Sequence, residues 1–88
     1  MQAQSTKLAK ILGKIIQQHR ISLGKSVYKI SAESSVPKTT WLRIEKGICE
    51  NLYLSSVWKI AEGLEIPPEE LIKELREKLG DDFSLIEE

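Results

Sequence analysis

Cysteine and histidine are almost absent from this 88-residue chain, which has one of each, Cys49 and His19. One cysteine cannot form an internal disulfide, and the pair falls short of a Cys/His zinc site. A single histidine on an otherwise helical apolar pattern also leaves no Ser–His–Asp or Cys–His set for nucleophilic catalysis. We therefore predict a free thiol at Cys49 and a half-buried structural role for His19. We expect no metal, no cofactor and no enzymatic activity.

Long apolar runs are missing too, as are an apolar signal core at the N-terminus and a glycine-rich phosphate loop. The first two absences predict no membrane-spanning segment and no secretion signal. The third removes the usual motif for nucleotide phosphates. With one cysteine and an ordinary balance of 41% apolar and 30% charged residues, the chain is expected to be a single cytoplasmic domain.

Net charge is also lacking, because 13 basic residues offset 13 acidic ones. The distribution is uneven, however. Residues 1–47 hold nine Lys and Arg against two Glu, a net charge of +7, and residues 48–88 carry the opposite charge. Such a chain can present a basic surface to nucleic acid although its sum is nil. Solvated charges without any partner would give the same asymmetry.

Apolar residues recur at helical spacing throughout the chain, and no segment has the alternation of a strand. The pattern predicts an all-α, compact five-helix domain over residues 1–79 and an acidic tail over 80–88. Ser5 and Ser26 are expected to cap the first two helices, and Gly24 and Gly80 to follow the ends of the first and last. The predicted helices cover about 6–23, 27–33, 37–46, 54–63 and 68–79.

The third predicted helix, within "VPKTTWLRIEKG", has two unlike faces. At 100° per residue, Trp41 and Ile44 fall on one side, where they can anchor the helix in a core. The other side carries cations, a hydroxyl and one leucine. Arg can bind guanine edges, Thr can bind a base or phosphate, and an aliphatic group can touch a thymine methyl. The residues expected to face DNA bases are Lys38, Thr39, Leu42 and Arg43.

The run "VYKISAESSVPKTTWLRIEKG" resembles a helix-turn-helix unit of the lambda-repressor-like family, also called the Cro or XRE family. Four of its five usual apolar positions are apolar here, with Ser34 as the exception, and Ser31 occupies the position that must be small. "LGKIIQQHR" is similar to the family's first helix, and "NLYLSSVWKIAEGLEIPPEELI" to its fourth and fifth. About 60 residues are covered. One departure is Ser35, which stands where the family usually has a glycine of positive φ.

This resemblance implies several site residues. Arg20 of the first helix is expected to pair with Glu45 at the end of the third. The residues expected near DNA phosphates are Lys25, Ser26, Tyr28, Thr40 and Lys46.

The function implied is that of a sequence-specific, double-stranded-DNA-binding transcriptional regulator of the Cro-like repressor, controller or antitoxin type. The alternative is a helix-turn-helix adaptor with weak or no DNA binding, which would use the acidic C-terminal half to bind a protein partner. We also expect a homodimer, because apolar residues extend beyond the needs of a small core. The residues predicted for its contact are Trp58, Leu75, Leu79 and Phe83. A tail that folds back on its own monomer is the competing interpretation.

Overall fold

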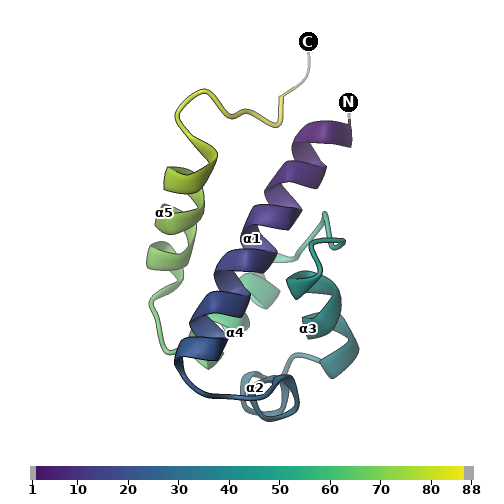
Figure 1. Cartoon of the computed structure of the whole chain (residues 1–88), viewed down its shortest axis with the longest axis vertical. Helices are drawn as coiled ribbons and strands as arrows, with labels where there is room; N and C mark the ends of the chain where they lie inside the picture. The colour runs from purple at the N-terminus through teal and green to yellow at the C-terminus, as the bar shows by residue number, and fades with distance from the viewer. Residues whose placement is uncertain (1, 87–88) are drawn as a thin grey trace.

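The computed structural model describes residues 2–86, and this part of the chain contains five α-helices and no strand (Figure 1). The predicted all-α, five-helix fold is thereby confirmed. Met1 and residues 87–88, which belong to the predicted domain and tail, lie outside the described residues. The helices are α1 Gln2–Ser22, α2 Val27–Ser34, α3 Lys38–Glu45, α4 Leu54–Gly63 and α5 Pro68–Leu79.

Helix boundaries differ from the predicted ones mainly at the start of α1. This helix begins at Gln2, so Ser5 lies inside its first turns and is not the N-cap. Gln and Ala are good helix formers, which explains the extension. α3 begins one residue later than predicted, because Pro37 has φ −56° and ψ 143° and therefore precedes the helix. α4 and α5 have the predicted bounds.

The apolar core lies where α1 passes between α3 and α5 (Figure 1). Ile15 and Ile16 of α1 are fully buried, as are Trp41 of α3 and Leu71 of α5. α1 approaches α3 closely at Gly13. A side chain at Gly13 would overlap the carbonyl oxygen of Ile44 and would come within 2.9 Å of the Glu45 carbonyl oxygen. Glycine at this position therefore determines how near the two helices lie.

Two further contacts tie α1 to the C-terminal part of the chain. The Nε2 of His19 lies 2.7 Å from Glu74 Oε1 on α5, which gives the histidine the structural role that was predicted. After α5, the chain crosses back toward the start of α1 (Figure 1). There the Lys7 ammonium lies 6.0 Å from the centre of the Phe83 ring, and Gln4 donates a hydrogen bond to the Ser84 carbonyl oxygen. The tail thus packs on its own monomer. None of the helices in residues 2–86 has both the length and the apolarity needed to cross a bilayer.

Candidate nucleic-acid interface

α2 and α3 are joined by a three-residue turn, residues 35–37. Ser35 adopts the left-handed conformation, with φ 60° and ψ 30°, and its N–H bonds to the Ser31 carbonyl oxygen. The Val36 N–H bonds to the same oxygen at 3.1 Å, and the Val36 side chain is buried. The positive φ at Ser35 is the conformation that the family resemblance implied for this position.

Small residues on α2 allow it to pack closely against its neighbours. Ser31 and Ser34 are both buried, and each hydroxyl bonds to a backbone carbonyl oxygen of the same helix. A side chain at Gly63 of α4 would come within 2.7 Å of Ser34 Cβ. Ser34 therefore replaces the usual apolar residue at a point where α2 and α4 are nearly in backbone contact.

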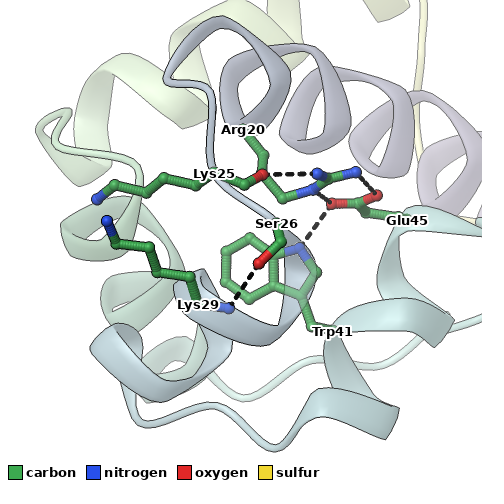
Figure 2. A network of polar contacts seen from close by, with 6 residues as sticks. All are labelled: Arg20, Lys25, Ser26, Lys29, Trp41 and Glu45. Atoms are coloured by element: carbon green, nitrogen blue, oxygen red, sulfur yellow. Dashed lines mark hydrogen bonds and ion pairs between the residues drawn. The ribbon is translucent and has the colours of Figure 1, made fainter.

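A polar network joins α3 to α1 and to the loop before α2 (Figure 2). Arg20 donates from Nε to Glu45 Oε2 at 2.6 Å and from Nη2 to Glu45 Oε1 at 3.0 Å. Its Nη1 donates to the Lys25 carbonyl oxygen at 2.8 Å, which attaches the loop before α2. The Trp41 Nε1–H donates to Glu45 Oε2 at 2.6 Å. α1, the start of α2 and α3 are thus held by one carboxylate and one guanidinium.

The pair between Arg20 and Glu45 is largely withdrawn from solvent, with side-chain exposures of 14% and 6%. The hydrogen bond to Glu45 raises the pKa of Arg20 above its ordinary value, against the opposing effect of burial. Arg20 is therefore charged at neutral pH. A buried pair of this geometry contributes orientation more than net stability.

The opposite face of α3 is open to solvent. Lys38, Thr39 and Arg43 are exposed, and Lys46 is exposed just after the helix. Leu42 is half-buried beside them, whereas Trp41 and Ile44 are buried on the inner face. The predicted division of α3 into an anchoring side and a basic side is observed. Contact between the basic side and DNA bases stays a prediction.

The residues predicted near phosphates differ in how exposed they are. Ser26 is exposed and caps α2, since its Oγ accepts a hydrogen bond from the Lys29 backbone N–H at 3.0 Å. Tyr28, in the first turn of α2, is 72% exposed. Lys46 is exposed and Thr40 is half-buried. These four residues remain available for the predicted contacts.

The structure gives Lys25 a different role from the predicted phosphate contact. Its ammonium lies 2.7 Å from Glu33 Oε1 and 3.0 Å from Glu65 Oε2, and its side chain is only 16% exposed. The hydrogen bond that Lys25 donates to Glu33, followed by the one it donates to Glu65, raises the pKa of Lys25. This cation connects α2 to the turn between α4 and α5, so we no longer include it among the phosphate contacts.

The four residues predicted for a dimer contact are not all exposed. Leu75 is 7% exposed and belongs to the core of its own monomer, so the expectation that it is exposed is wrong. Leu79 packs against that core, and Phe83 is half-buried beside Lys7. Trp58 alone among the four is well exposed, at 53%.

Other exposed apolar residues lie on α4 and α5. Leu54 is 75% exposed and lies one turn before Trp58 on α4. Ile72 of α5 is also exposed, and it lines the same hollow as Val57 of α4. We call Leu54, Trp58 and Ile72 the α4–α5 apolar surface.

One basic residue near α3, Lys10, was not among the predicted site residues. Lys10 of α1 is exposed, and its side chain lies on the backbone of Gly47, directly after Lys46. A side chain at Gly47 would come within 2.8 Å of Lys10 Cα and 3.1 Å of Lys10 Cγ. Gly47 has φ 75°, which also favours glycine. Lys10 therefore extends the basic surface beyond the end of α3, although it lies 37 residues before Gly47 in the chain.

These features define an all-α, five-helix fold with a helix-turn-helix unit, in which an exposed basic α3 follows α2 after a tight turn. The crystal structure of the restriction-modification controller protein C.AhdI from Aeromonas hydrophila is similar to it, with a TM-score of 0.67 and 28% sequence identity. The similarity covers 74% of this chain and 96% of C.AhdI. No protein-family model and no curated protein matches the sequence.

Proposed function

We propose that this chain is a sequence-specific regulator of transcription that binds double-stranded DNA and places α3 in the major groove. The observation that carries the proposal is the combination of the exposed basic face of α3 with the Arg20–Glu45–Trp41 network behind it. A helix that reads bases must be held rigidly while its other face stays free. The similarity to a restriction-modification controller protein supports the same conclusion.

In this proposal the outer face of α3 contacts base edges. Arg43 and Lys38 bind acceptors on guanine, Thr39 binds a base or phosphate oxygen, and Leu42 meets a thymine methyl. Phosphate contacts come from Lys46 and from Lys10, which flank the end of α3. Ser26 and Thr40 provide further contacts at the starts of α2 and α3, where backbone N–H groups also attract phosphate.

We further propose that the active form is a homodimer of the Cro-like controller type, located in the cytoplasm with its DNA. One recognition helix reads only a few base pairs, whereas two copies can read half-sites about 10 base pairs apart. The α4–α5 apolar surface provides the contact, because Leu54, Trp58 and Ile72 are exposed in the monomer.

Selection of bound duplexes from a random DNA pool tests the proposal, followed by fluorescence anisotropy over a range of salt concentrations. We expect the selected duplex to bind about a thousandfold or more tightly than a scrambled one. The logarithm of affinity should fall against the logarithm of salt with a slope of about −2 per chain, because Lys46 and Lys10 each neutralise one phosphate. Equal, weak binding to both duplexes would contradict the proposal and favour the adaptor alternative, in which the acidic C-terminal half binds a protein.

A further inference from the structure

An aromatic ring and a cation meet on the exposed surface between α2 and α3. Tyr28 is the second residue of α2, and Lys38 is the first residue of α3. The Lys38 ammonium lies 5.8 Å from the centre of the Tyr28 ring, within the range of a cation–π contact. Both side chains are exposed, so the contact lies on the surface that is offered to DNA.

The ring is attached to a rigid part of the domain. Ser26 caps α2 directly before it, and Ile30 and Ser31 are buried directly after it. The Ser31 hydroxyl also donates to the Tyr28 carbonyl oxygen at 3.0 Å, which holds the backbone at this position. By contrast, a lysine side chain has four rotatable bonds and no planar group to direct it. The ring of Tyr28 therefore restricts a cation that is otherwise free to sweep over the start of α3.

We propose that Tyr28 is a positioning residue for DNA recognition: its ring directs the Lys38 ammonium toward the α2 side of the groove, where Lys38 binds an acceptor on one base edge. The inference rests on the proposed DNA-binding function and adds a specificity-determining role to it. Tyr28 acts through Lys38, so its hydroxyl group is not the part that matters. This differs from the simpler interpretation that Tyr28 binds a phosphate with its hydroxyl.

The affinity test uses the duplex selected by the wild-type protein and four variants: Tyr28→Leu, Tyr28→Phe, Lys38→Met and the double variant Tyr28→Leu/Lys38→Met. We expect Tyr28→Leu to weaken binding about threefold to tenfold, because it removes the ring. Tyr28→Phe keeps the ring and should restore wild-type affinity. The double variant should bind no more weakly than Lys38→Met, since Tyr28 has nothing to position without Lys38. Lys73→Met, on the exposed side of α5, is the matched control for loss of a lysine charge.

The specificity test measures affinity for duplexes with each base pair of the site changed in turn. Tyr28→Leu should lose its preference at the same base pair as Lys38→Met, and at no other. Loss of affinity by Tyr28→Phe equal to that of Tyr28→Leu would overturn the inference in favour of a hydroxyl contact. The inference would also be overturned if the fold-losses in affinity of Tyr28→Leu and Lys38→Met multiplied in the double variant. A loss of affinity in Tyr28→Leu that is equal for all duplexes would overturn it as well.

Nuclear magnetic resonance of the free protein tests the contact without DNA. The methylene protons next to the Lys38 ammonium should be shifted upfield by the ring in wild type and Tyr28→Phe, and should lose this shift in Tyr28→Leu. Absence of the shift in wild type would overturn the pairing. If wild type binds no duplex, the proposed function fails and this role fails with it. If wild type binds and Tyr28→Leu binds equally well, this inference alone is wrong.

Discussion

Arg20 and Glu45 are 25 residues apart in the chain, yet they share two hydrogen bonds, of 2.6 Å and 3.0 Å. The carboxylate oxygen that receives the shorter bond also accepts one from Trp41 Nε1. These contacts join α3 to α1 and, through the Lys25 carbonyl oxygen, to the loop before α2 (Figure 2). The orientation of α3 is therefore set by contacts behind its exposed residues, within the domain itself.

Removal of either charge in this pair should destabilise the fold. Glu45→Gln or Arg20→Met leaves the other charge in a desolvated position, at an expected cost of about 3–5 kcal/mol in the free energy of unfolding. The double variant should cost less than the two changes added together, since it strands neither charge. Urea unfolding followed by circular dichroism measures the cycle, with Glu77→Gln on the exposed surface of α5 as a control. A coupling energy under about 0.5 kcal/mol would show that the two sites are independent.

Gly13→Ala should destabilise the protein although alanine favours helices. On an exposed helix surface this change would stabilise by about 1 kcal/mol. At Gly13 the added methyl group overlaps the Ile44 carbonyl oxygen, so α1 and α3 must separate, and we expect a net loss of about 1–3 kcal/mol. The neighbouring change Gln17→Ala, at an exposed position of α1, should lie within about 0.5 kcal/mol of wild type. If Gly13→Ala proves as stable as wild type, the helices are not in the close contact described.

Cations around α3 should separate into two groups by their effect on DNA binding. Arg43→Ala should weaken binding to the selected duplex by about 1–3 kcal/mol and relax the preference at one base pair. Lys46→Ala and Lys10→Ala should weaken binding to all duplexes similarly and reduce the salt slope by about one each. Anisotropy titrations at several salt concentrations distinguish the two patterns. An unchanged affinity in Arg43→Ala would mean that α3 presents another face to DNA.

The ion pair of Glu33 with Lys25 predicts a dependence of stability on pH. The hydrogen bond from Lys25 lowers the pKa of Glu33, so the folded-state value lies below the unfolded one of about 4.3. The pair therefore stabilises the fold above the unfolded pKa, and this contribution disappears as the pH falls through the folded pKa. Thermal unfolding should show a lower Tm for Glu33→Gln than for wild type at pH 7, and the difference should shrink as the pH falls below the unfolded pKa of Glu33 and through its lower folded pKa. Glu62→Gln, exposed on α4, should give no such pH-dependent difference, and a constant difference for Glu33→Gln would contradict the linkage.

Local features of the fold were predictable because their causes lie within a few residues. Apolar spacing and proline positions predicted α4 and α5, and Ser26 was identified as the cap of α2 from its type and place. The start of α1 was not, because Ser5 has the right chemistry for a cap but lies among residues that continue the helix. The Arg20–Glu45 pair came from the family resemblance, since nothing in the spacing of the chain brings these two residues together.

Tertiary partners explain the remaining differences. In the sequence, Lys25 resembles a free cation near the start of α2. The two carboxylates that it binds, Glu33 and Glu65, come 8 and 40 residues later in the chain. Leu75 belongs to an apolar stripe whose spacing does not reveal how much of α5 the core covers. Lys10 could be assigned to the exposed face of α1, yet only its position on Gly47 connects it with α3. These relationships depend on how the helices pack against one another, and the apolar spacing within one helix does not predict that.

A final prediction concerns the homodimer. Because Leu75 is buried and Phe83 packs on its own monomer, we expect the α4–α5 apolar surface to mediate the contact, with Trp58 at its centre. Trp58→Gln should raise the dimer dissociation constant by about tenfold to a hundredfold, since an exposed tryptophan is the type of residue that dominates protein contacts.

Ile21→Gln, at another exposed apolar position, should leave the dimer dissociation constant unchanged. Deletion of residues 81–88 should also have little effect, since the tail contacts α1 of the same chain. Sedimentation equilibrium at micromolar concentration measures each value. A wild-type protein that remains monomeric there, and binds the selected duplex as one chain per site, would refute the dimer.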